Sequence, residues 1–276
     1  MSAHVRELEL NTDPLRVVQI TDTHLSHREG GSLLGLDTDF SLQQVIKLAL
    51  AEPRPAGLVL ATGDIADNGD ADAYRRARRY LRGLAEDTFW LVGNHDCMEN
   101  MQGELGNRGQ LVRVINTGHW QIVLLDSHIP GETGGELGEE ELAWLEQCLG
   151  ESAARGLHSL VCLHHQPIPV GSAWIDQQMV RDREQFFAVI DRYPQVRGVL
   201  WGHVHQDLER SRGGVRLLST PSTCVQFAPD CDVFKVDDAS PGYRWLDLYS
   251  DGRIETGVRR VQGVEFAVDL ESRGYQ

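Results

Sequence analysis

Short apolar runs alternate with helix-patterned stretches along most of the chain. Five such runs lie at residues 17–20, 58–61, 89–92, 160–163 and 199–201. Their polar or glycine boundaries are typical of strands that are buried on both faces. Between them, apolar positions at helical spacing predict helices at residues 41–51, 71–86, 138–149 and 182–193, with Ser41 as a candidate N-cap. This alternation predicts right-handed crossovers and a parallel sheet.

The later part of the chain has a different pattern. Apolar runs at residues 120–125, 215–218, 243–248 and 253–258 are joined by shorter links, and the last two flank Ser250-Asp251-Gly252, a hairpin turn signal. We therefore expect a second, largely antiparallel sheet packed on the first, with helices outside. No linker or repeat divides the chain. The expectation is one domain over residues 1–276, with a core at about 14–260 and a C-terminal tail at about 261–276.

Each run of the parallel pattern is followed by residues that can bind a metal ion. They are, in chain order, Asp22 and His24, then Asp64, then Asn94, then His164, and finally His203 with His205. In open α/β sheets, ligands bind at the carboxyl ends of the strands. Taken alone, each fragment has an ordinary explanation, such as a turn at Gly63-Asp64 or a core histidine at His164. The five fragments together predict a metal site.

The donor atoms indicate which metals would bind. Carboxylate and amide oxygens with imidazole nitrogens, and no thiolate, suit Fe²⁺ or Mn²⁺, with Zn²⁺ also possible. Seven ligands are too many for one catalytic ion, but they suit two ions about 3.5–4 Å apart that share one carboxylate. Asp64 is the expected bridge. Asp22, His24 and His205 would complete one ion's shell, and Asn94, His164 and His203 the other.

Such a pair of ions implies a mechanism. It would polarise a phosphoryl oxygen and supply a metal-bridging hydroxide at neutral pH. His95 is adjacent to Asn94 but is not needed as a ligand, so we expect it to assist the leaving group. Asp96 is expected either to orient the His95 ring or to cap the turn. We expect substrate to contact His24, Asp64, Asn94, His95, His164 and His205.

The five fragments resemble the motif blocks of the calcineurin-like metallophosphoesterases, over about residues 16–206. This resemblance implies a four-layer αββα sandwich, with two mixed β-sheets flanked by helices. It also implies the bridged two-metal centre, with all seven ligand positions filled. Segments 126–131 and 164–167 are similar to the bacterial class III cyclic-nucleotide phosphodiesterases, and segments 222–229 and 241–245 to their cyclic-AMP enzymes. The implied reaction is hydrolysis of 3′,5′-cyclic AMP (cAMP) to 5′-AMP. Glycerophosphodiesters or 2′,3′-cyclic nucleotides are alternative substrates, and a non-catalytic scaffold is the alternative outside enzymes.

Charge and cysteine usage limit the partners. The net charge is −15, and the only dense basic stretch, residues 74–79, fits a solvated helix face. We therefore expect no nucleic-acid polymer and no membrane partner, and a monomer or homodimer that binds cAMP. The five cysteines are odd in number and scattered, and the start resembles no secretory signal, which favours a cytoplasmic location.

Overall fold

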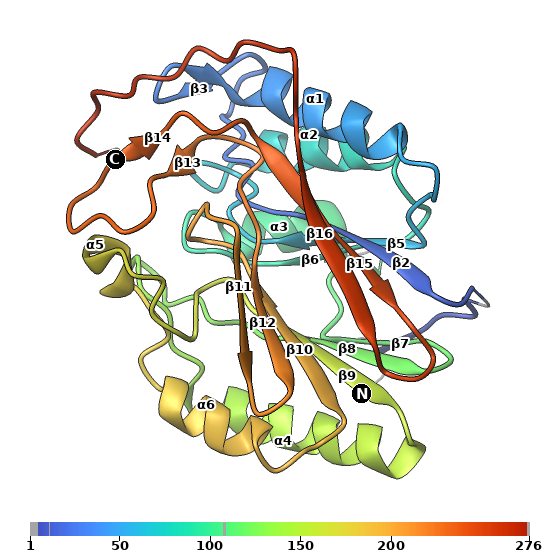
Figure 1. The fold of residues 1–276 in the computed structure, drawn as a ribbon. Helices are drawn as coiled ribbons and strands as arrows, with labels where there is room; N and C mark the ends of the chain where they lie inside the picture. The colour runs from blue at the N-terminus through green and yellow to red at the C-terminus, as the bar shows by residue number, and fades with distance from the viewer. Residues whose placement is uncertain (1–4, 11, 107–108, 275–276) are drawn as a thin grey trace.

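The computed structural model describes residues 5–10, 12–106 and 109–274, which form two facing β-sheets with helices on both outer sides (Figure 1). Helices α1 (Thr38–Leu50) and α2 (Ala71–Leu81) cover one sheet. Helices α4 (Gly138–Arg155) and α6 (Arg183–Ile190) cover the other. The predicted four-layer αββα sandwich is confirmed. No helix in the described part of the chain is long and apolar enough to cross a membrane.

The sheet under α1 and α2 has five strands in the order β16-β15-β2-β5-β6. Its parallel part comprises β2 (Leu15–Ile20), β5 (Leu58–Thr62) and β6 (Thr88–Leu91). The hairpin of β15 (Gly242–Leu248) and β16 (Ile254–Arg260) joins antiparallel to β2. The predicted turn at residues 250–252 is the connection of this hairpin, where the Tyr249 N–H donates to the Arg253 carbonyl oxygen at 3.0 Å.

The second sheet has seven strands in the order β1-β7-β8-β9-β10-β12-β11. At its centre, four strands are parallel: β8 (Trp120–Leu124), β9 (His158–Cys162), β10 (Val196–Trp201) and β12 (Val215–Ser219). The outer strands are β1 (Val5–Glu7), β7 (Val114–Asn116) and β11 (Leu208–Arg212). Shorter pieces are β3 (Ser32–Leu33), β4 (Leu36–Asp37), β13 (Gln226–Phe227), β14 (Val236–Asp237), α3 (Met98–Leu105) and α5 (Ala173–Asp176).

Both sheets are mixed, as the four-layer sandwich implies, whereas the pattern of apolar runs alone predicted one parallel and one largely antiparallel sheet. Successive residues of a strand point to opposite faces. In β2, Val18 and Ile20 pack toward the layer of α1 and α2, whereas Val17 packs between the sheets. The central strands of both sheets are buried on both faces in this way. Their apolar runs therefore look alike in the sequence and do not reveal which sheet a strand joins.

Helix boundaries also differ from the expectation. Helix α1 begins at Thr38 and is capped by Asp37, whose carboxylate accepts the Phe40 N–H at 2.8 Å. Ser41, the expected cap, is buried within the helix, and its hydroxyl donates to the Thr223 carbonyl oxygen. Helix α2 is shorter than predicted and α4 is longer.

Candidate metal centre

The predicted ligands gather where the carboxyl ends of strands from both sheets meet. Asp22 and His24 follow β2, Asp64 follows β5, and Asn94 follows β6. From the other sheet, His164 follows β9, and His203 and His205 follow β10. The sequence predicted that all of these donors lie at the edge of one sheet. This prediction is wrong, because each of the two sheets supplies part of the donors. All of these residues except the half-buried Asn94 are almost completely buried.

One group of donors comprises Asp22, His24 and His205. The two Nε2 atoms of His24 and His205 are 3.2 Å apart, and His205 Nε2 lies 3.4 Å from Asp22 Oδ1. His205 Nδ1 is 2.8 Å from the Val225 carbonyl oxygen. Because a carbonyl can only accept, Nδ1 carries the proton and Nε2 presents its lone pair to the group.

A second group adjoins the first through Asp64. Its Oδ2 atom lies 3.2 Å from His164 Nε2 and 3.8 Å from His24 Nε2, while its Oδ1 accepts the His95 N–H. His164 Nδ1 is 2.9 Å from the Thr62 carbonyl oxygen, so Nε2 is again the nitrogen that faces the donors. Asp64 Oδ2 therefore stands between the two groups, as a bridging ligand must.

Several buried donor atoms at this site lack a hydrogen-bond partner among the described residues. They include Asn94 Oδ1 and His203 Nε2. Buried polar atoms are nearly always satisfied, so a cluster of unsatisfied ones marks a place where another group binds. Oxygen and imidazole nitrogen donors fit divalent metal ions, and the residues present therefore fit the cations that the sequence predicts.

The backbone is strained at the same residues. Seven non-glycine residues in the described chain have positive φ, and five of them are predicted ligands: Asp22, His24, Asp64, His203 and His205. This conformation disfavours residues with a Cβ and persists only where the surroundings impose it. The glycine before a ligand leaves room for another donor, since a Cβ on Gly202 would lie 2.7 Å from Asp22 Oδ2.

The ligands strongly affect one another's protonation. Burial lowers the pKa of His164, but the charges of Asp64 and Asp22 outweigh this effect and raise it to about 9. Burial likewise opposes ionisation of Asp64, yet the nearby rings of His164 and His95 hold its pKa well below its usual range. His164 therefore retains a proton beside the ionised Asp64, and a metal ion would displace that proton.

His95 lies beside the donors, and Asp67 positions it. The ring nitrogen Nδ1 of His95 is 2.9 Å from the Asp67 carbonyl oxygen, and the ring stands edge-on to His24 with centroids 4.8 Å apart. The Asp67 carboxylate also lies 3.5 Å from His24 Nδ1. Asp67 therefore orients both histidines, a role that the sequence reasoning did not assign to it.

Asp96 does not take the expected role of orienting His95. Its carboxylate accepts the backbone N–H groups of Ile65, Ala66 and Gly93, and also the hydroxyl of Tyr74 at 3.1 Å. These bonds tie the loop after β5 to the loop after β6, because one carboxylate satisfies donors from both. The alternative role, capping a turn, describes Asp96 better. Burial and the charge of Asp64 raise its pKa to about 6.

Residues 222–227 contact two of the proposed ligands, Asp22 and His205, and hold them in position. The Ser222 hydroxyl donates to the Asp22 carbonyl oxygen at 2.7 Å, and Val225 holds the His205 ring as described above. Phe227 stacks on His205 with ring centroids 4.2 Å apart and an interplanar angle of 8°. The sequence singled out this segment only by resemblance, and these contacts give it a physical role.

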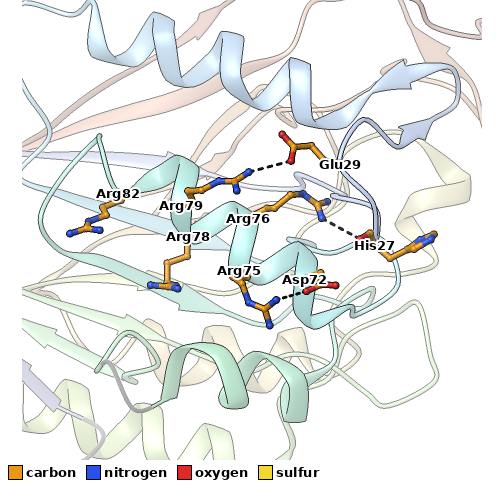
Figure 2. Close-up of a pocket in the computed structure, with 8 residues that line it drawn as sticks. All are labelled: His27, Glu29, Asp72, Arg75, Arg76, Arg78, Arg79 and Arg82. Carbon is orange, nitrogen blue, oxygen red and sulfur yellow. Dashed lines mark hydrogen bonds and ion pairs between the residues drawn. The ribbon is translucent and has the colours of Figure 1, made fainter.

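Arg76 braces the loop that follows His24. Figure 2 shows it among the arginines of α2, with its guanidinium directed at the backbone of His27. It also donates to the carbonyl oxygens of Ser26 and Arg28 and pairs with Asp39 at 3.0 Å. Arg76 is buried, so the expectation of a wholly solvated basic helix face is wrong at this position.

Comparisons of the sequence identify relatives. The sequence profile described as calcineurin-like phosphoesterase matches residues 15–207. The 3′,5′-cyclic adenosine monophosphate phosphodiesterase CpdA of Pseudomonas aeruginosa is 44% identical over 94% of each chain. CpdA of Escherichia coli K12 is 40% identical over 95% of each chain. A 3′,5′-cyclic-nucleotide phosphodiesterase of Nostoc is 41% identical over 90% of this chain and 93% of its own.

Solved structures share the fold at much lower identity. A dimetal phosphatase from Danio rerio has a TM-score of 0.62 at 16% identity, covering 91% of this chain and all of its own. GAP50 of Plasmodium, described as an anchor in the inner membrane complex, has the same TM-score at 12% identity, covering 95% of this chain and 90% of its own. These two likenesses concern the fold alone. The profile and the relatives in sequence show that the chain belongs to the calcineurin-like phosphoesterase family, in the group that contains the CpdA phosphodiesterases.

Proposed function

We propose that this protein hydrolyses 3′,5′-cAMP to 5′-AMP at a centre of two divalent metal ions. The observation that carries the proposal is the meeting of seven oxygen and nitrogen donors from both sheets at one buried place. The substrate is inferred from relatives of 40–44% identity whose names specify cyclic nucleotides. Neither observation alone would suffice, because the fold also occurs in a protein described as an anchor.

The distances suggest how the donors divide between the ions. Asp22, His24 and His205 form one set, in which each ligand atom is within 4.8 Å of the others. We assign Asn94, His164 and His203 to the other ion. Asp64 is assigned to both, because its Oδ2 lies 3.2 Å from His164 Nε2 and 3.8 Å from His24 Nε2. We infer Fe²⁺ or Mn²⁺ as the ions, with Zn²⁺ possible, because the donors are carboxylate, amide and imidazole without thiolate.

The residues around the ions divide the remaining tasks. Bound cations would supply the positive charge that draws a phosphoryl oxygen and acidifies a water molecule. His95 is held by Asp67 through Nδ1, which leaves Nε2 as the nitrogen to donate a proton to the departing ribose oxygen. Asp67 keeps both His95 and His24 in orientation, and Asp96 fixes the two loops that carry Asp64 and His95.

Replacing Asp64 tests the shared-ligand assignment. We expect Asp64→Asn to lose metal from both positions, because it removes the anionic oxygen that both groups approach. Metal content by mass spectrometry and cAMP turnover should fall together. Asp191→Asn, at an exposed ion pair with Arg212, is the matched control and should retain both. An Asp64→Asn protein that keeps two ions per chain would contradict the assignment.

A further inference from the structure

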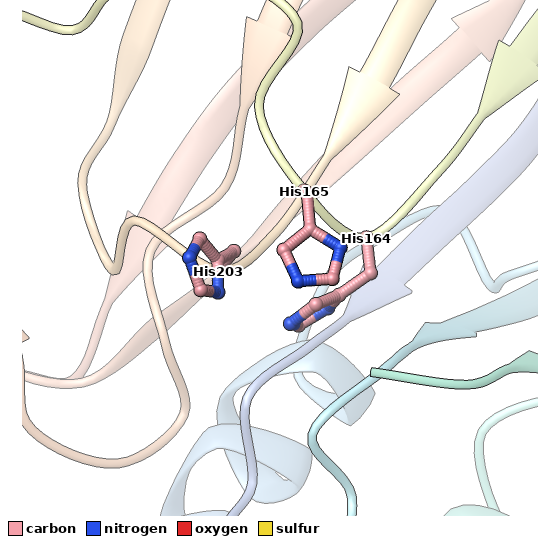
Figure 3. A group of neighbouring side chains, drawn as sticks. All are labelled: His164, His165 and His203. Carbon is pink, nitrogen blue, oxygen red and sulfur yellow. The ribbon is translucent and has the colours of Figure 1, made fainter. Parts of the chain in front are cut away.

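A second cavity lies away from the metal centre and is lined by residues of helix α2, strand β6 and strand β1. Its volume is about 330 Å³, and its polar lining includes Arg6, Arg78, Arg82, Trp90 and Gln110. Figure 3 shows three histidines that follow β9 and β10 at the metal centre, and none of them lines this cavity. Nothing in the proposed reaction uses the cavity.

Three arginines at this cavity lack a counter-ion. The guanidiniums of Arg6, Arg78 and Arg82 form no ion pair with a carboxylate in the described chain, although Glu86 and Asp87 also line the cavity. The chain has 41 acidic residues against 26 basic ones, so a shortage of carboxylates does not explain this. The cavity therefore has positive charge available to an anion.

Other arginines of helix α2 provide a comparison. Arg75 pairs with Glu104, and Arg79 pairs with Glu29. Arg78 lies on the same helix, but Figure 2 shows its side chain directed away from Glu29. It is also half-buried, whereas Arg75 and Arg79 are exposed. A charged group that is partly removed from water and has no partner is costly, so a bound anion would stabilise Arg78.

Three buried polar atoms of the lining have no hydrogen-bond partner within residues 5–10, 12–106 and 109–274. They are Arg78 Nε, Trp90 Nε1 and Gln110 Oε1. Trp90 is only 1% exposed, so bulk water does not satisfy its indole N–H. Guanidinium and indole nitrogens can only donate, whereas an amide oxygen can only accept. A ligand with both acceptor oxygens and a hydroxyl group would match all three atoms.

We propose that this cavity binds a phosphate group, either as free phosphate or as part of a small phosphomonoester. Phosphate oxygens would accept from Arg78 and Trp90, and a hydroxyl of the ligand would donate to Gln110. Arginine suits this ligand because its planar guanidinium can form two parallel hydrogen bonds to phosphate. The volume falls within the range of small-molecule sites, about 300–1,000 Å³, and leaves room for more than the phosphate group.

NMR of the Trp90 indole N–H tests the site locally. The full ¹⁵N-labelled chain, loaded with diamagnetic Zn²⁺, is titrated with inorganic phosphate, with glucose 6-phosphate or with chloride as the control for ionic strength. We expect a saturable shift of the Trp90 indole resonance with both phosphates and none with chloride. The chelator-treated chain should show the same shift, because no proposed metal ligand lines the cavity.

The outcomes of this titration separate the possible ligands. Tighter binding of glucose 6-phosphate than of inorganic phosphate would assign the cavity to phosphomonoesters, and equal binding would assign it to free phosphate. Phosphate that binds only at the metal centre would leave the Trp90 resonance unchanged and would overturn the proposal.

Variants on helix α2 and at its end provide the matched comparison. Arg78→Gln should weaken phosphate binding at this cavity by at least about tenfold, because it removes charge-assisted hydrogen bonds. Arg82→Gln changes an exposed residue, so folding is not at issue, and it should weaken binding by a smaller factor. Arg75→Gln is the control and should leave binding unchanged, because Arg75 does not line the cavity. Wild-type affinity in both Arg78→Gln and Arg82→Gln would contradict the proposal.

Discussion

A backbone carbonyl, rather than a carboxylate, holds the imidazole of His95. Burial of the ring lowers its pKa, but the charge of Asp64 and the hydrogen bond to the Asp67 carbonyl outweigh burial and raise it. The ring of the metal-free protein therefore retains a proton more readily than an ordinary histidine. Two cations nearby would oppose this effect, so the hydrogen bond to Asp67 becomes important for keeping the proton-donating form.

Replacing His95 tests its role with the leaving group. We expect His95→Ala to reduce turnover of cAMP by about 10²–10⁴-fold, the usual range for general acid catalysis, while metal content stays near wild type. The loss should be smaller for bis-p-nitrophenyl phosphate, whose leaving group needs little protonation. Steady-state kinetics on both substrates check this. Equal losses on the two substrates, or the loss of one ion, would show that His95 has another role.

At the residue scale, the sequence predicted that the proposed ligands lie close together, but it did not predict the residues that hold them in place. Asp22, Asp64 and His164 each follow directly after an apolar run, so the local pattern alone places them at strand ends. Asp67 contacts the rings of His24 and His95, which lie far from it along the chain, and no local sequence pattern predicts such contacts. Asp96 was predicted to act on its neighbour His95, whereas its partners lie mainly in the loop after β5.

At the scale of elements, helix α2 carries both exposed arginines and one buried arginine that contacts the loop after His24. Arg75 and Arg76 are adjacent, but the Arg75 side chain is 56% exposed and that of Arg76 only 9%. Arg75 pairs with Asp72 and Glu104 at the surface, whereas Arg76 braces the loop after His24 (Figure 2). The sequence could not separate them, because burial of an arginine depends on the partner, Asp39, that α1 supplies.

The two neighbouring arginines allow a matched test of this brace. We expect Arg76→Gln to lower the free energy of unfolding by about 3–5 kcal/mol, because it leaves Asp39 buried without its partner. Arg75→Gln removes a surface ion pair and should cost about 1 kcal/mol or less. Denaturant unfolding of metal-loaded protein measures both. Similar small decreases in the free energy of unfolding for the two variants would mean that Arg76 does not stabilise the loop after His24 as the structure indicates.

The sequence pattern also could not predict which of the two sheets each strand joins. The strands β2, β5 and β6 of one sheet and β9 and β10 of the other all contain short apolar runs and are followed by polar residues. The chain passes to the second sheet after β6, where β7 and β8 form an antiparallel pair. Only tertiary packing decides this, since every one of these strands has apolar neighbours on both faces.

For the whole molecule, the meeting of the two sheets is what creates the site. Neither sheet carries a complete donor set, so the centre exists only when both are packed together. The chain carries 41 acidic and 26 basic residues, and we expect the phosphate of a substrate to be met mainly by the metal ions. This arrangement favours a small diester with one negative charge over a polyanion such as nucleic acid.

The most direct test of the account is the product formed from 3′,5′-cAMP. Purified protein is stripped with a chelator, divided, and either left without metal or reconstituted with Mn²⁺ or Fe²⁺, and the reaction mixtures are separated by chromatography. Glycerophosphodiesters and 2′,3′-cyclic AMP are run in parallel. We predict 5′-AMP from the reconstituted protein and no turnover in the stripped sample. Full activity without metal, accumulation of 3′-AMP, or a clear preference for glycerophosphodiesters would contradict the account.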